Sequence, residues 1–343
     1  MTTRSRHDSI DLLRGFVMAL MALDHTRDFF AGFGSPTDLA TTTPALFFTR
    51  WITHFCAPVF ILLAGVSVHL QVSSGRSPAA VSRFLVTRGL WLVALELTVV
   101  HLGWNLNPFA HFFLLQVIWA IGWSMVVLAG LIRLPRPVIA AIGGAMVFFH
   151  NTLDGVHSTH PLWAITHESQ PWRPAPGWMV YVAYPLVPWV GVMALGYLLG
   201  QWYDLDAGAR RRRLVATGAG LTALFVLLRA INVYGDPEPW THQPRALFTA
   251  LSFLNCEKYP PSLDYLLMTL GPALIALALL EGVRSPLARP LLTFGRVPLF
   301  YYLVHLPLLQ VSAGVYLLAR WGFSGLRSAI AQRQGPGLAL PGV

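Results

Sequence analysis

Charged residues and cysteines are both scarce in this sequence of 343 residues. Charged residues make up 11% of the chain, against roughly a quarter in an ordinary soluble domain. The two cysteines, Cys56 and Cys256, are too few for a disulfide framework or a structural zinc site. These scarcities argue against a soluble enzyme and against a disulfide-stapled secreted domain, and we expect no bound metal.

Most of the charge that is present is positive, with a formal net charge of +9 at pH 7. The basic residues are almost all arginine, and they fall singly or in pairs between apolar runs, except for the run Arg210 to Arg213. In a membrane protein, arginines in such positions set the topology and meet anionic lipid headgroups. The pattern therefore favours a lipid bilayer as partner and argues against nucleic acid.

Hydrophobic residues make up 55% of the chain. A membrane-spanning helix needs about 20 mostly apolar residues, so this content suffices for about nine spans. We therefore predict an all-α, polytopic transmembrane helix bundle that forms a single integral-membrane domain over residues 1–343. The expected spans are 9–31, 48–71, 84–103, 111–132, 135–150, 178–203, 213–234, 261–283 and 297–320.

The first expected span is the weakest, because its clean apolar run covers only residues 15–23. A signal peptide has an apolar core of that length, but the charged stretch Asp24 to Asp28 follows here instead of a small-residue cleavage site. We therefore expect a retained helix that hides its charges inside the bundle.

Arginine placement also predicts the orientation of the chain. Most arginines of the short loops fall on the side of the N-terminus, which is therefore expected to be cytoplasmic. Nine spans would leave the C-terminus outside. The tail 335–343 turns apolar and stops, like the lead-in to a tenth span that is missing.

With this orientation, the polar side chains collect near the outer ends of different helices. A charged group inside a bilayer costs about 2.5–3.5 kcal/mol on insertion scales, so such groups are functional candidates. Asp24, His25, Arg27 and Asp28 end the first helix, and Arg27 can pair with Asp24 three residues away. The other candidates at this depth are Arg50, His54, Glu96, Asn105, Asn107, Gln116, Lys258 and Tyr259. A purely structural ion pair of Asp24 with Arg27, and an interhelical role for His54, remain open.

Three arginines lie at the inner ends of expected spans, namely Arg14, Arg88 and Arg296. Guanidinium groups bind phosphate with two parallel hydrogen bonds, so these residues are candidates for holding an anionic cofactor. The alternative is that they only fix the topology.

Several segments, in order along the chain, resemble the heparan-α-glucosaminide N-acetyltransferase catalytic-domain family, particularly its bacterial multi-pass members. The segments are 9–16 (SIDLLRGF), 23–30 (LDHTRDFF), 49–60 (TRWITHFCAPVF), 184–189 (YPLVPW), 258–263 (KYPPSL) and 294–301 (FGRVPLFY). The resemblance implies a transmembrane acetyltransferase that uses acetyl-coenzyme A as co-substrate and a sugar or amino sugar as acceptor. It also implies a location in the bacterial inner membrane, with the pocket facing the periplasm.

The resemblance departs from the eukaryotic pattern at the catalytic histidine. The eukaryotic histidine falls near Pro44 in this chain, and His54 stands where the eukaryotic enzyme has an aspartate. The heparan substrate is therefore not carried over, and His25 and His54 become the candidate catalytic residues.

Acyl transfer from a thioester needs a base, donors for the oxyanion and exclusion of water. We expect His25 or His54 as the base, oriented by Asp24 or Asp28. The expected substrate-binding residues are Arg27, Arg50, Glu96, Asn105, Asn107, Gln116, Tyr184, Lys258 and Tyr259. Among these, Asn105, Asn107 and Gln116 would steady the oxyanion, and Arg50 or Lys258 would bind an anionic acceptor. Direct transfer and an acyl-histidine intermediate both remain open, as do a monomer and a homodimer.

Two other functions fit parts of the pattern. A proton-coupled transporter of a sugar or lipid precursor would use the same buried charges, Asp24, Arg27, Asp28 and Glu96, but the sequence shows no two-fold repeat of the kind many transporters have. Haem binding between two histidines is less favoured, because no two expected spans carry paired histidines at matching depths.

Overall fold

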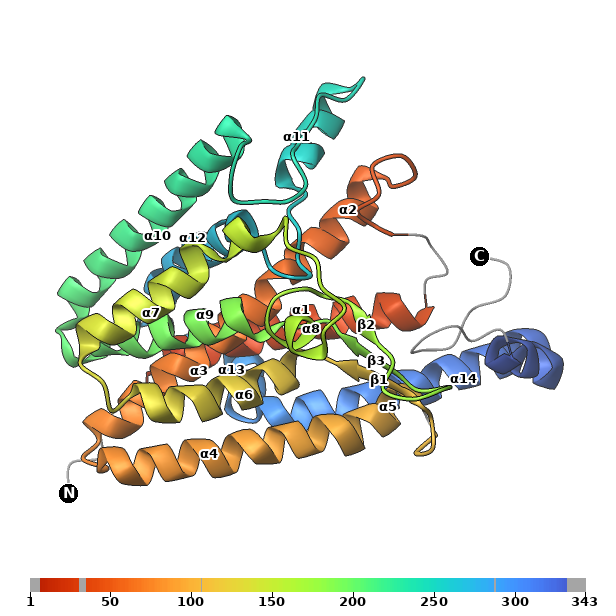
Figure 1. Ribbon diagram of the computed structural model, residues 1–343, viewed down its shortest axis with the longest axis horizontal. Helices are drawn as coiled ribbons and strands as arrows, with labels where there is room; N and C mark the ends of the chain where they lie inside the picture. Colours follow the sequence, from red (N-terminus) through yellow and green to blue (C-terminus); the bar gives the residue numbers. More distant parts are fainter. Residues whose placement is uncertain (1–6, 31–34, 106, 287, 332–343) are drawn as a thin grey trace.

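The computed structural model describes residues 7–30, 35–105, 107–286 and 288–331, and this part of the chain is mostly helical (Figure 1). The α-helices are α1 (Asp8–Phe30), α2 (Pro44–Trp51), α3 (Cys56–Ser73), α4 (Pro78–Leu95), α5 (His101–Asn105), α6 (Val117–Leu131), α7 (Arg136–Phe148), α8 (Pro161–Thr166), α9 (Leu186–Leu199), α10 (Ala207–Ile231), α11 (Ala246–Leu254), α12 (Leu263–Leu279), α13 (Ala288–Arg296) and α14 (Pro298–Ala331). Short 3₁₀ or π turns are η1 (Ile52–Phe55), η2 (Glu96–Val100), η3 (His150–Leu153) and η4 (Gly200–Asp204).

Every expected span contains a helix. Figure 1 shows α4, α6 and α14 running roughly along the long axis of the molecule. Within the described residues, four helical stretches are long and apolar enough to cross a membrane, namely Pro44–Ser73, Pro78–Asn105, Ala207–Ile231 and Pro298–Gly325. Shorter apolar helices cover Val117–Leu131, Arg136–Phe148 and Leu263–Leu279. The total of nine spans and the cytoplasmic N-terminus stay predictions, and the tail 335–343 lies outside the described residues.

Two expected spans begin with a β-strand instead of a helix, so the all-α prediction was wrong there. Strands β1 (Phe112–Leu115), β2 (Pro171–Trp172) and β3 (Met179–Val182) form a small sheet in the order β1-β3-β2. β1 pairs with β3 in parallel, and β2 pairs with β3 antiparallel. A short apolar run carries no period that separates strand from helix, so only the pairing of segments far apart in the sequence decides the outcome.

Glycines allow the helices to cross with their backbones in contact. A Cβ atom on Gly15 of α1 would lie 1.8 Å from the carbonyl oxygen of Leu291, and one on Gly295 of α13 would lie 1.8 Å from that of Asp11. Small residues at such crossings are typical of helix packing in membranes. The same reciprocal arrangement joins Gly65 with Gly196, Gly89 with Gly122, Gly143 with Gly191 and Gly218 with Gly271.

Helix α1 contacts α3, α12, α13 and α14, so a helix with a short apolar run packs against several other helices. Asp11 and Asp24 of α1 are buried. The expected helix is present and turns Asp24 towards the neighbouring helices, whereas Asp28 stays exposed.

Candidate active site

A cavity of about 260 Å³ lies beside the second half of α1. Its wall combines residues of α1, α3, α5, β1 and β3 with the loop before α12. Eight of the polar residues expected at the site line it: Asp24, His25, Asp28, Arg50, Gln116, Tyr184, Lys258 and Tyr259. Thr53, Cys56 and Trp104 line it as well. The cavity thus brings together side chains spread over most of the chain, whose roles stay predictions.

Asp24 is the centre of the ionic contacts in this cavity. The Arg50 guanidinium donates from Nη1 to both carboxylate oxygens of Asp24, at 2.8 and 2.7 Å. The Thr53 hydroxyl donates to Asp24 Oδ1 at 2.9 Å. Arg27 also pairs with Asp24, and it donates to Asp28 at 3.1 Å. Asp24 is therefore engaged by two guanidinium groups and a hydroxyl, and it holds Arg50 against the cavity.

His25 is oriented by another histidine and not by the predicted aspartates. His25 Nδ1 lies 2.6 Å from Nε2 of His305 on α14, and the two rings are stacked with centroids 4.9 Å apart. His305 Nδ1 lies 3.0 Å from the carbonyl oxygen of Tyr301. The premise that no two spans carry histidines at matching depth was therefore wrong. The two nitrogens are in direct hydrogen-bond contact, which leaves no space for a haem iron between them.

His54 does not line the cavity. Its side chain is buried, with the residue only 3% exposed, and its ring packs on Tyr265 with centroids 5.3 Å apart. The backbone carbonyl of His54 accepts a hydrogen bond from the Tyr265 hydroxyl at 2.8 Å. The 3₁₀ turn η1 has about three residues per turn, so His54 does not share the face of Arg50 as an α-helix would require. His25 is thus the predicted base that the cavity contains.

Three further predicted residues make structural contacts outside the cavity. Glu96 accepts hydrogen bonds from the backbone N–H groups of Gln116 at 3.1 Å and Trp119 at 3.3 Å, so it caps the N-terminus of α6. Asn105 donates to the carbonyl oxygens of His101 and Phe112. Asn107 is exposed and accepts from the backbone N–H of Phe109 at 3.0 Å.

The inner arginines are engaged by acidic residues of α1. Arg14 donates to Asp11 at 3.0 Å and to the Ser67 hydroxyl at 3.1 Å. Arg296 donates to Asp8 at 3.3 Å and lies 3.8 Å from Asp11. Within the described residues, no hydrogen bond or ion pair connects Arg88 to this group. Arg14 and Arg296 therefore meet at Asp11, and Arg88 lies apart on α4.

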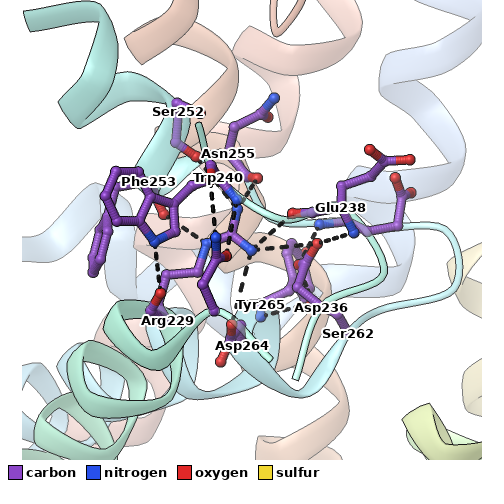
Figure 2. A network of polar contacts seen from close by, with 12 residues as sticks. Arg229, Asp236, Glu238, Trp240, Ser252, Phe253, Asn255, Ser262, Asp264 and Tyr265 are labelled. Atoms are coloured by element: carbon purple, nitrogen blue, oxygen red, sulfur yellow. Dashed lines mark hydrogen bonds and ion pairs between the residues drawn. The ribbon is translucent and has the colours of Figure 1, made fainter. Parts of the chain in front are cut away.

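The loop that brings Lys258 and Tyr259 to the cavity is fixed by a residue that the sequence analysis did not single out. Arg229, near the end of α10, is 2% exposed. Figure 2 shows its side chain enclosed by this loop and by the end of α11. Its guanidinium donates to four backbone carbonyl oxygens, those of Phe253 at 3.0 Å, Glu238 at 2.9 Å, Ser252 at 3.3 Å and Asn255 at 2.8 Å.

Two carboxylates complete this network. Asp236 and Asp264 lie 3.5 and 3.9 Å from Arg229 Nη1. Asp236 accepts from the Glu257 backbone N–H at 2.9 Å and from the Ser262 hydroxyl at 2.7 Å (Figure 2). Burial raises the pKa of Asp236, although the Ser262 hydroxyl and the Arg229 guanidinium act in the opposite direction. The network thus clamps the loop on both sides of Lys258.

Lys258 itself is 7% exposed, and its ammonium lies 5.0 Å from the centre of the Tyr259 ring, a cation–π contact. Tyr259 in turn packs edge-on against Tyr184 with ring centroids 5.6 Å apart. Lys258, Arg50 and Arg27 outnumber the carboxylates of Asp24 and Asp28, so the charge around the cavity suits an anionic or electron-rich ligand. Among the described residues, no group of three His, Cys, Asp or Glu side chains could hold a metal ion.

The apolar helices and the enclosed polar cavity are those of a helical membrane protein with an imidazole-bearing pocket. Residues 6–230 match the family model described as heparan-alpha-glucosaminide N-acetyltransferase, catalytic, and the chain therefore belongs to this family. No curated protein matches the chain. The matched segment includes Asp24, His25 and Arg50, whereas Lys258, Tyr259 and His305 lie beyond it.

Proposed function

We propose that the protein transfers an acetyl group from acetyl-coenzyme A to a sugar or amino-sugar acceptor in the cavity around His25, on the periplasmic side of a bacterial inner membrane. The observation that carries the proposal is the cavity itself. In a chain of an acetyltransferase family, it joins a half-buried imidazole with a fixed guanidinium and a lysine.

In the proposed reaction, His25 acts as a general base. The acceptor hydroxyl or amine attacks the thioester carbonyl carbon while His25 takes its proton, the C–S bond breaks, and the proton passes to the departing thiolate. The Gln116 side chain and the Arg50 guanidinium line the same cavity and are suited to stabilise the negative charge on the carbonyl oxygen. Attack by the imidazole itself, followed by transfer from an acyl-histidine, uses the same residues.

The size of the cavity limits what it can hold. Ligand pockets commonly have volumes of about 300–1,000 Å³, and this cavity has about 260 Å³. It therefore suits the acetyl-thioester end and one sugar ring, and the nucleotide part of the coenzyme would bind elsewhere. Arg14, Arg88 and Arg296 are the residues we propose for its phosphates, and Arg14 and Arg296 would have to exchange Asp11 for phosphate.

The competing proposal is a proton-coupled transporter of a sugar or lipid precursor, without acyl chemistry. Thermal unfolding of the purified protein in detergent separates the two. A ligand that binds only the folded protein stabilises it by about 2.7 kcal/mol at 100 times its Kd. We expect acetyl-coenzyme A to raise the unfolding midpoint. Stabilisation by free sugars and none by acetyl-coenzyme A would favour the transporter and overturn the acetyltransferase.

A further inference from the structure

A general base for acetyl transfer needs only one imidazole, yet the structure pairs His25 with a second one, His305. His305 lies on α14, outside the segment matched to the family, and its ring contacts His25 on α1. The hydrogen-bond chain runs from the Tyr301 carbonyl through His305 to His25. Because a carbonyl oxygen can only accept, the positions of the protons along this chain can be worked out.

The proton on His305 must be on Nδ1, which faces the Tyr301 carbonyl at 3.0 Å. A neutral imidazole carries a single N–H, so Nε2 of His305 is then an acceptor. Nε2 lies 2.6 Å from Nδ1 of His25, and that nitrogen must therefore donate. The lone pair of His25 is consequently on Nε2, the nitrogen that is not used in the pair.

We propose that His305 is a positioning residue that fixes both the tautomer and the orientation of His25 for acetyl transfer. This inference rests on the proposed function. When His25 takes the acceptor proton on Nε2, both of its nitrogens carry hydrogen, and the Nδ1–H bond to His305 becomes charge-assisted and stronger. His305 then stabilises the imidazolium that forms during the reaction, in addition to holding the neutral ring.

The surroundings of His25 restrict the ring further. Trp104 packs edge-on against it with ring centroids 5.4 Å apart, and Tyr302 approaches at 6.5 Å. The charged groups around it are Asp24 and Arg27 of α1, Arg50 of α2 and Lys258 of the loop before α12. Within the described residues, none of these groups is hydrogen-bonded to the His25 ring in place of His305.

The test uses the full-length protein in detergent, acetyl-coenzyme A and glucosamine as the acceptor probe. Loss of the partner that orients a metal-ligating histidine typically costs about 10- to 100-fold, and we expect a similar cost for a catalytic imidazole. We expect His305→Ala to lower kcat by about that factor, with little change in KM for acetyl-coenzyme A. His305→Gln should recover part of kcat, because its side-chain oxygen can accept from His25 Nδ1–H.

A double-mutant comparison separates positioning from a merely structural role. If His305 acts through His25, adding His305→Ala to His25→Ala should cause no further loss of activity. Gln310→Leu is the matched control, because Gln310 is a fully buried polar residue on the same helix with no hydrogen-bond partner in the described structure. We expect the kcat of the Gln310→Leu protein to stay within about twofold of wild type.

The inference is overturned if His305→Ala keeps the wild-type kcat, or if it slows the His25→Ala protein by the same factor as it slows the wild type. If the His305→Ala protein fails to fold, His305→Gln provides the test. In that case the inference holds only if His305→Gln lowers kcat more than Gln310→Leu does. If His25→Ala retains full activity, the proposed function of the cavity fails, which is a different result from an inert His305.

Discussion

Replacing Arg229 by methionine tests whether one buried guanidinium fixes the loop that carries Lys258 and Tyr259. The substitution keeps much of the side-chain volume, but it removes the donor of four backbone carbonyl oxygens. It also leaves Asp236 and Asp264, whose side chains are 1% and 2% exposed, without their cation. Removing one partner of a buried ion pair costs about 3–5 kcal/mol, and we expect a loss of that size in the free energy of unfolding.

Two measurements read this loss. Chemical unfolding in detergent gives the free energy of unfolding. Limited trypsin digestion measures opening of the loop, because Lys258 is buried in the folded protein and becomes cleavable when the loop opens. Arg213→Met is the matched control: Arg213 is exposed on the same helix, and its loss should change stability by less than about 0.5 kcal/mol. A loss below about 1 kcal/mol for Arg229→Met, with no faster cleavage at Lys258, would show that Arg229 does not fix the loop.

Three further predictions concern other parts of the molecule. Burial lowers the pKa of His150, in the turn after α7, to about 4, so between about pH 6.5 and 4 the unfolded chain binds a proton that the folded chain does not. His150 should therefore contribute a fall in stability of about 3 kcal/mol as the pH drops through this window. In unfolding titrations from pH 7 to 4, His150→Phe should reduce the total pH dependence by about that amount, and His157→Phe, at an exposed site, should leave it unchanged. Gly15→Val should prevent folding, because its Cβ would lie 1.8 Å from a backbone oxygen, whereas Gly144→Val, with nothing within 4 Å, should be recovered folded in size-exclusion chromatography. Glu96→Ala should lower the unfolding free energy by about 1–2 kcal/mol through loss of the cap on α6, and a large rise in the acceptor KM at unchanged stability would instead support substrate binding by Glu96.

The sequence was sufficient for the helices and for much of the cavity. Apolar runs and their charged ends identify helices regardless of what packs on them, so α3, α4, α10 and α14 fall where the hydropathy predicts them. Asp24, Arg50 and Lys258 were expected at one depth because ionisable groups near the ends of apolar helices are expensive to leave in lipid, and all three line the cavity.

The rest depends on tertiary packing that sequence patterns do not encode. Depth along an expected span placed His305 away from His25, but the crossing of α14 with α1 brings the two rings together. Glu96 satisfies the N–H groups of a helix that begins 21 residues later, at Val117. Arg229 is a single charge at the end of an apolar helix, and only the fold of the following loop explains its burial.

The rate of transfer from radiolabelled acetyl-coenzyme A to glucosamine tests most directly whether the cavity holding His25 performs acetyl transfer. His54→Ala provides the comparison, since His54 is a buried histidine in the same region that does not line the cavity. We predict that His25→Ala reduces the rate by about 100-fold or more, while His54→Ala folds and retains most of it. Equal rates for the wild type and His25→Ala would show that acetyl transfer does not depend on this cavity.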